Sequence, residues 1–278
     1  MDDDARPPNP WTSAALAVGR AVARASVWTA DKAVYAYRAV DPDVQRHVVH
    51  GPLVGLGLLL PRAKAVEEKP DDGYRPLVFV HGMAGDPSNF YAMRAFFSVV
   101  GRRRTYAVDL SQCVDVRAMA DVVAAFVREV RAVNGLSDGA RVDLVAHSQG
   151  GLATRHALLD PEFASLVGTV VTLGTPHAGT HAARYAGTVQ GRDLRPDADA
   201  MTRLRGQVPW QGPVRLVCFW SRNDLLVLPA ESAYVEGAEA VEFAGATHLS
   251  YLLDPQCWQA VWDQLRRDPA ATREPSST

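Results

Sequence analysis

Several features that would point to a specialised class of protein are scarce in this sequence. Only three of its 278 residues are cysteines: Cys113, Cys218 and Cys257. They lie far apart and show no Cys-x-x-Cys or Cys/His spacing typical of a metal site, so no metal is expected. One disulfide with a spare thiol and three reduced thiols both fit this spacing. The chain also shows no internal repeat.

The sequence also has no large excess of charge of one sign and no long hydrophobic run. The formal net charge is -2, which gives no electrostatic reason to expect nucleic acid or an anionic membrane as a partner. The apolar run 48–61 contains glycine and proline and is shorter than the roughly 20 residues that span a bilayer. We therefore expect no transmembrane segment, with contact to a lipid interface as a lesser alternative.

The N-terminus also lacks the basic start of a secretory signal. It reads MDDDARPPNP, which is acidic and rich in proline. This favours a cytoplasmic location, with secretion left open as the alternative.

The sequence does have the composition of an ordinary globular protein. Hydrophobic residues make up 47% and charged residues 22%, and a chain of this length can bury a large core without disulfides. We expect a disordered N-terminus over residues 1–10, a helical segment over 11–61, one main domain over 75–267 and a disordered tail over 268–278.

Within the main domain, predicted strands alternate with predicted helices. Short apolar runs bounded by turn residues indicate buried strands at 76–82, 105–110, 141–147, 168–174, 214–220 and 240–243. Apolar residues at helical spacing, with turn residues at the ends, indicate helices at 115–133, 149–159 and 255–266. This alternation predicts an α/β fold with a mostly parallel, doubly wound sheet. Residues 177–211 fit neither a strand nor a regular helix and follow a strand, which is where a small lid insertion would lie.

The segment RVDLVAHSQGGLATRHAL, residues 141–158, places a serine between a strand and a helix. Ser148 is flanked by the small residues Ala146, Gly150 and Gly151, which a sharp strand-to-helix turn requires. The free N–H groups and the dipole of the helix N-terminus favour a developing negative charge beside this serine. Ser148 is therefore predicted to be a nucleophile rather than a turn residue.

Four motifs resemble one family of enzymes in the same order. HGMAG, AHSQGG, TLGTPHAGT and THLSYL resemble segments of the bacterial triacylglycerol lipases and carboxylesterases, which belong to the α/β-hydrolase superfamily. Ala146 stands where the usual pattern has glycine, and alanine is the next smallest residue. The resemblance implies the α/β-hydrolase fold with a small lid, and a reaction that uses no cofactor and no metal.

In this family the catalytic residues follow the chain order serine, acid, histidine. Of the eight histidines only His248 lies beyond residue 181, so it is the expected general base and acid. Ten carboxylates lie between Ser148 and His248, and only Asp224 follows closely on a predicted strand. Asp224 is therefore the expected acid, with Glu231 as the reserve candidate.

The resemblance also implies an oxyanion hole and a substrate cleft. By position, the backbone N–H groups of Met83 and Gln149 would stabilise the oxyanion. His147 is expected to point away from Ser148 into the packing. Four further positions are expected to contribute to the cleft: His81, Gly82, His177 and Gly179. A purely structural turn is an equal alternative for the last two.

Together these features predict a serine carboxylic ester hydrolase, a lipase or carboxylesterase that acts through an acyl-enzyme. Tyr185 and Trp210 give the lid region an apolar, aromatic content that suits a lipid-like or other apolar ester. A thioesterase or a polyesterase of the same fold is an alternative. In a different class, a binding protein that has kept the fold without the activity is the remaining alternative.

Overall fold

The computed structural model describes residues 65–267. The predicted N-terminal segments 1–10 and 11–61 and the predicted tail 268–278 lie outside the described residues. Among residues 65–267, none of the helices combines the length and the apolar character that crossing a bilayer requires.

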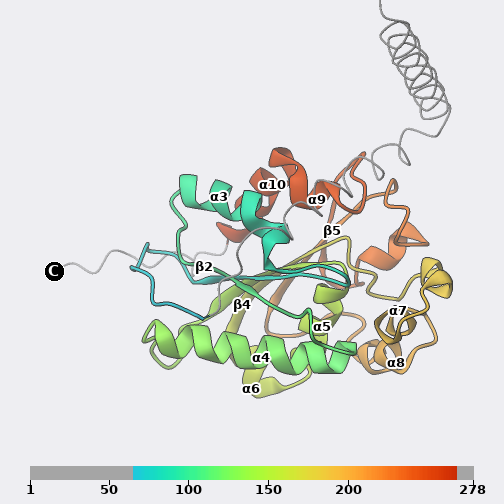
Figure 1. The fold of residues 1–278 in the computed structure, drawn as a ribbon, viewed down its shortest axis with the longest axis horizontal. Helices are drawn as coiled ribbons and strands as arrows, with labels where there is room; N and C mark the ends of the chain where they lie inside the picture. The colour runs from blue at the N-terminus through green and yellow to red at the C-terminus, as the bar shows by residue number, and fades with distance from the viewer. Residues whose placement is uncertain (1–64, 268–278) are drawn as a thin grey trace, which may run out of the picture. The chain divides into compact units, whose positions relative to one another are not determined.

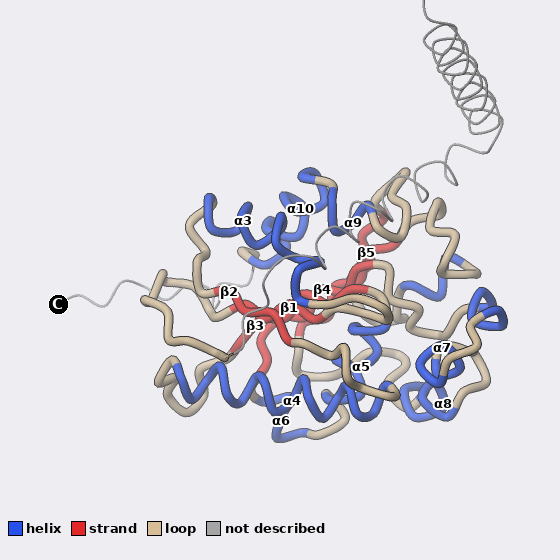
Figure 2. Tube along the Cα trace, in the orientation of Figure 1, coloured by secondary structure: helices blue, strands red, loops and turns tan. Residues whose placement is uncertain are grey.

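The described residues form a six-stranded sheet in which every pair of neighbours is parallel, in the order β2-β1-β3-β4-β5-β6 (Figures 1 and 2). The strands are β1 (Leu77–Val80), β2 (Thr105–Val108), β3 (Val142–His147), β4 (Val167–Leu173), β5 (Arg215–Trp220) and β6 (Glu239–Glu242). Every residue of β1, β3 and β4 is buried, as expected for central strands covered on both faces. The predicted parallel, doubly wound sheet is confirmed.

Helices cover both faces of the sheet (Figure 1). One face carries α3 (Tyr91–Val99), α9 (Ser250–Leu253) and α10 (Pro255–Leu265), and the other carries α4 (Val116–Val133), α5 (Gln149–Ala157) and α6 (Pro161–Ser165). Each face has its own cluster of buried apolar side chains. The carboxyl ends of all six strands therefore open at the same edge of the sheet, between two firmly packed layers.

Aspartates set where three of these helices begin. Asp115 accepts a hydrogen bond from the N–H of Ala118 and caps α4. Asp160 and Asp254 cap α6 and α10, and each is followed by a proline, whose fixed φ suits the first helical position. The predicted helix 149–159 therefore ends earlier than expected, at Ala157, and a separate short helix follows it.

Two of the helical segments that the sequence analysis did not predict lie between the first two strands. The 3-10 helix η1 (Pro87–Phe90) and α3 lie between β1 and β2, where no helix was expected. α3 has no side-chain cap at its N-terminus and buries only Met93 and Phe97. Met93, Phe96 and Phe97 do have helical spacing, but they cover a single turn, and so short a pattern without a cap does not by itself indicate a helix.

The lid region 177–211 is more regular than predicted. It contains the 3-10 helix η2 (His181–Tyr185) and two short helices, α7 (Val189–Asp193) and α8 (Asp199–Arg205). Apolar residues of η2 and α8, together with Leu194 just after α7, pack on Val116 of α4 and Leu152 of α5. The expectation that this region lacks helices was wrong because each helix is under two turns long and owes its stability to this packing. A further 3-10 helix, η3 (Ala230–Ala233), lies between β5 and β6.

Candidate active site

Ser148 stands at the sharp turn between β3 and α5. Its φ of 54° and ψ of -128° place it in a region that residues with a side chain rarely adopt. The turn is enforced by close packing: a Cβ on Gly150 would lie 2.6 Å from the carbonyl oxygen of Val80, and one on Gly151 would overlap the side chain of Thr175. The small residues noted in the sequence are therefore required by the neighbouring chain, which holds Ser148 in this strained conformation.

A chain of hydrogen bonds joins Ser148 to the predicted histidine and acid. The His248 Nε2 atom lies 2.9 Å from Ser148 Oγ, and its Nδ1 atom lies 2.8 Å from Asp224 Oδ2. Asp224 follows β5, and His248 precedes α9, so both come from the same edge of the sheet as Ser148. The structure thus brings together three residues that are separated by up to 100 positions in the sequence.

Asp224 is held in its ionised form although it is 1% exposed. Burial by itself would raise the pKa of this carboxyl, but the charge and hydrogen bond of His248 and the N–H of Leu226 outweigh burial and lower it below its usual value. An ionised Asp224 can orient the imidazole and stabilise its cation. Glu231, the reserve candidate, is 52% exposed and faces Arg222 instead.

The two predicted oxyanion donors lie on adjoining segments. A Cβ on Gly82, next to Met83, would stand only 3.1 Å from the backbone nitrogen of Gln149. Neither the Met83 N–H nor the Gln149 N–H donates a hydrogen bond to another of the described residues. These two N–H groups, which have no partner among residues 65–267, can donate to an oxygen beside the serine on which negative charge develops.

Of the four residues expected in the cleft, only Gly82 lines it. His81 instead accepts the Leu110 N–H at Nε2 and lies 2.9 Å from the Gly82 carbonyl at Nδ1. Its Nδ1–H therefore donates to that carbonyl and supports the loop from behind. His81 was expected in the cleft, but these two hydrogen bonds hold its ring behind the loop.

His177 and Gly179 also lie outside the cleft. The His177 ring is buried beside Thr172, 3.0 Å from its hydroxyl, and burial followed by the charge of Arg155 lowers its pKa well below the usual value. Gly179 has a φ of 84°, and a Cβ there would meet Pro196. Both belong to the turn that enters the lid, which is the structural alternative weighed for them.

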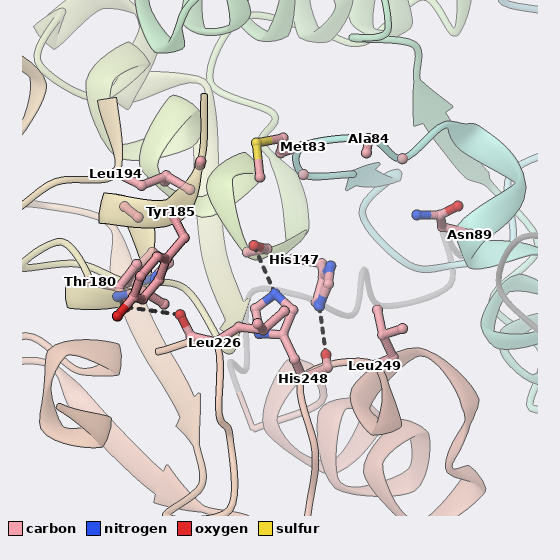
Figure 3. A pocket seen from close by; sticks show the side chains of 17 residues that line it. Met83, Ala84, Asn89, His147, Thr180, Tyr185, Leu194, Leu226, His248 and Leu249 are labelled. Carbon is pink, nitrogen blue, oxygen red and sulfur yellow. Dashed lines mark hydrogen bonds between the residues drawn. The ribbon is translucent and has the colours of Figure 1, made fainter. Parts of the chain in front are cut away.

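The cleft is a cavity of about 500 Å³ that extends to both sides of His248. Figure 3 shows Leu194, Tyr185, Thr180 and Leu226 on one side of this histidine, and Ala84, Asn89 and Leu249 on the other. Most of its other walls are small or apolar, namely Gly82, Met83, Gly85, Pro176, Ala182, Ala183 and Ala186. The cavity can therefore accommodate an apolar group next to Ser148.

Sequence reasoning missed most of these cavity residues. Leu226 lies two residues after the predicted acid and Leu249 directly follows the predicted base, and this closeness is the signal that could have indicated them. Tyr185 lines the cavity. Trp210 does not: it is half-buried, packs against the core and donates its indole N–H to the Val214 carbonyl. His147 is buried as expected, yet it also lines the cavity and packs on the His248 ring.

The structure also shows the state of the three cysteines and whether side chains gather that could bind a metal. Cys113, Cys218 and Cys257 are free thiols, which decides between the two alternatives left open by their spacing. Within residues 65–267 there is no group of three or more His, Cys, Asp or Glu side chains that could hold a metal ion.

Comparison with known proteins agrees with this site. The sequence model of the palmitoyl protein thioesterase family matches residues 76–214, half of the chain. This chain belongs to the palmitoyl protein thioesterase family. The match runs from β1 to the residue before β5 and so includes the serine turn and the lid.

This family member is also similar to bacterial lipases. It is 32% identical over 128 residues to a triacylglycerol lipase of Pseudarthrobacter phenanthrenivorans and to one of Burkholderia plantarii. The match covers 42% of this chain, and 38% and 34% of those two proteins. The chain thus matches little more than a third of the length of these curated relatives.

Solved structures show the same fold. Aspergillus fumigatus lipase B has a TM-score of 0.59 at 20% identity, over 79% of this chain and 58% of that one. Bacillus licheniformis lipase BlEst2 in its mature form has a TM-score of 0.57 at 20% identity, over 75% of this chain and 96% of that one. The family member therefore has the α/β-hydrolase fold, as the motifs predicted.

Proposed function

We propose that this protein is a serine carboxylic ester hydrolase that cleaves esters of apolar acyl groups through an acyl-enzyme. The observation that carries this proposal is the hydrogen-bonded chain from Ser148 Oγ through His248 to Asp224. A serine hydroxyl becomes a useful nucleophile only when a positioned base takes its proton, and this geometry supplies one. The triacylglycerol lipases that the chain resembles support the same class of reaction.

The reaction follows from the positions of these atoms. His248 Nε2 takes the proton of Ser148 Oγ while that oxygen bonds to the ester carbonyl carbon. The negative charge on the carbonyl oxygen is stabilised by the N–H groups of Met83 and Gln149. The proton on His248 then passes to the departing alcohol, leaving an acyl-serine. Water attacks this acyl group, gives a proton to His248, and the released Ser148 oxygen takes that proton back.

A thioesterase is the second candidate, because the matching family model is that of the palmitoyl protein thioesterases. The same three residues would serve both reactions, since they differ only in whether oxygen or sulfur leaves the tetrahedral intermediate. The apolar walls of the cavity suit a fatty acyl group in either case. The leaving group is therefore what an experiment has to distinguish.

The test measures the hydrolysis of matched substrates by the wild-type chain and by the variant Ser148→Ala. Oxygen esters and thioesters of the same acyl groups, from acetate to palmitate, would be hydrolysed under the same conditions. We expect wild-type turnover with a preference for longer acyl groups, and a fall of about 10⁴-fold or more in the variant. Higher kcat/KM for the thioesters would favour the second candidate.

A fluorophosphonate probe, which labels activated serines, tests the nucleophile independently of the substrates chosen. Covalent labelling of the wild type at Ser148, and none in Ser148→Ala, would establish the nucleophile without a substrate. If the wild type neither labels nor hydrolyses any ester, or if the variant is equally active, the proposal fails. A binding protein on a hydrolase fold would then be the better account.

A further inference from the structure

His147, which directly precedes Ser148, makes a hydrogen bond to the loop that carries His248. Its Nε2 atom lies 2.8 Å from the backbone carbonyl oxygen of His248, and the two imidazole rings are 4.7 Å apart (Figure 3). A carbonyl oxygen only accepts, so His147 Nε2 carries the hydrogen and donates it. The bond thus defines the tautomer of His147 and links the end of β3 to a residue 101 positions later.

This bond holds a different part of His248 from the bonds to Ser148 and Asp224. Ser148 and Asp224 hold the ring of His248, whereas His147 holds its backbone. His248 lies in a connection between β6 and α9, where Thr247 and Ser250 are hydrogen-bonded to each other on either side of it. The bond to His147 ties this connection to the rigid sheet at the residue that carries the base.

We infer that His147 is a positioning residue for His248, an inference that rests on the proposed function. By holding the His248 carbonyl, it fixes the distance between His248 Nε2 and Ser148 Oγ. Proton transfer depends steeply on that distance, and a misplacement of about 1 Å can cost about 100-fold in rate. His147 itself exchanges no proton: it keeps its Nε2 hydrogen while the proton of Ser148 moves to His248 and on to the leaving group.

The surroundings of His147 suit a donor that stays neutral. Burial, then the nearby His248, lowers the pKa of His147 to about 3; His81 acts in the same direction, while the hydrogen bond to the His248 carbonyl and the charge of Asp224 oppose the shift. When His248 takes up its proton, the two neighbouring rings therefore carry one positive charge rather than two. A charged donor in this place would repel the cation on which the reaction depends.

Substitutions at His147 separate the hydrogen bond from the bulk of the ring. His147→Gln keeps an N–H donor at a similar reach, whereas His147→Met fills the space without a donor. For His147→Met we expect kcat to fall between about tenfold and about 100-fold with KM changed by less than about threefold. For His147→Gln we expect kcat within about threefold of the wild type.

The matched control is another buried histidine with the same kind of bond. His156 Nε2 lies 3.0 Å from the Ala200 carbonyl oxygen, where it links α5 to α8. His156→Met is expected to lower the melting temperature by an amount similar to His147→Met while kcat stays near the wild-type value. The rate of fluorophosphonate labelling should fall in His147→Met by the same factor as kcat, because labelling also requires His248 to activate Ser148.

These measurements distinguish a failure of the inference from a failure of the proposed function. If Ser148→Ala abolishes activity but His147→Met retains wild-type kcat, or His147→Gln is as slow as His147→Met, the positioning role is wrong. If Ser148→Ala is as active as the wild type, the proposed function is wrong. Should His147→Met not fold, His147→Asn replaces it, since its shorter amide cannot reach the carbonyl and the same loss of kcat is expected.

Discussion

Gly82 lies directly against Ser148: a Cβ atom on Gly82 would stand 2.8 Å from the Cβ of Ser148 and 3.0 Å from the carbonyl oxygen of His147. Real Cβ atoms do not approach so closely, so any side chain at Gly82 would push the loop away from the serine turn. The separation of the two predicted oxyanion donors, Met83 and Gln149, is thus set by a residue without a side chain.

The first prediction follows from this contact. Gly82→Ala should lower kcat by about 10²–10³-fold, as expected when one oxyanion donor is displaced. Gly187→Ala is the matched control, since no atom lies within 4 Å of a Cβ at that exposed lid position. Steady-state kinetics of both variants would check the prediction. Wild-type kcat in Gly82→Ala would show that this loop does not contribute a donor.

The role of Asp224 gives a second prediction. Asp224→Asn should reduce kcat by about 10⁴-fold, because an amide facing His248 Nδ1 no longer selects the tautomer and cannot stabilise the imidazolium. The control is Glu231→Gln, which changes an exposed carboxylate near Arg222 and should leave kcat unchanged. Both rates would be measured on folded protein, as judged by circular dichroism. A kcat above one tenth of the wild type in Asp224→Asn would assign the acid elsewhere.

A third prediction concerns how the lid is held. The side-chain amide of Gln149 donates to the Gln190 carbonyl in α7 with a donor–acceptor distance of 2.8 Å, so one residue joins the serine turn to the lid. Gln149→Met keeps the backbone N–H but releases this link. We expect the KM for long acyl substrates to rise by roughly threefold to tenfold, with a smaller change in kcat.

The control for this change is Gln259→Met, at an exposed position of α10 far along the chain from the lid. Its KM should match that of the wild type for every acyl length. An unchanged acyl-length profile in Gln149→Met would show that the position of the lid does not depend on the buried amide.

A fourth prediction concerns stability at the opposite end of β3. Asp143 is fully buried and accepts hydrogen bonds from Arg102, at 2.6 Å, and from the Thr169 N–H. Asp143→Asn would leave the buried guanidinium of Arg102 without an anionic partner and should cost about 3–5 kcal/mol in the free energy of unfolding. Urea unfolding would measure this loss, and kcat per folded molecule should stay unchanged.

An exposed ion pair is the comparison for Asp143. Arg215 and Glu239 are bonded at the edge of the sheet with side chains 22% and 49% exposed. Glu239→Gln should cost less than about 1 kcal/mol because solvent screens this pair. Equal losses in the two variants would mean that the buried charge of Arg102 is compensated in another way.

A fifth prediction concerns the stability of the protein at acidic pH. The ordinary pKa of His147 is 6.5, and burial lowers it to about 3 in the folded protein; burial also lowers the pKa values of His156 and His177. Between these values the unfolded chain binds more protons than the folded chain, so the free energy of unfolding rises with pH. The contribution of His147 to the free energy of unfolding should therefore be fully present above its ordinary pKa of 6.5. It should be lost as the pH falls from 6.5 toward 3.

Urea unfolding between about pH 7 and about pH 4 would measure this slope. His147→Gln removes one of the titrating groups and should flatten the dependence without reversing it. A free energy of unfolding that is independent of pH over this range would show that these histidines are protonated in the folded protein.

The sequence by itself determined the features that depend on residues close together in the chain. The buried runs around residues 77–80 and 142–147, the alternation of strands with helices, and the small residues around Ser148 are all local signals. The resemblance of the four motifs added the order of the functional residues, and with it Asp224 and His248. Strands buried on both faces can be predicted from the sequence because they need apolar residues at consecutive positions.

Only the tertiary structure decided the features that depend on contacts between distant segments. The short lid helices α7 and α8 and the helix α3 carry too short a periodic pattern to be predicted, and their stability depends on the segments that pack on them. His81 and His177 belong to recognisable motifs, yet hydrogen bonds to Leu110 and Thr172 turn both rings away from the cavity.

His147 shows the same division in one residue. Its position next to Ser148 follows from the sequence alone. Its bond to the His248 carbonyl exists only because β3 and the connection before α9 meet at one edge of the sheet. A local pattern specifies which residues form the turn. Which side chains face one another across it is decided by packing between segments about 100 residues apart.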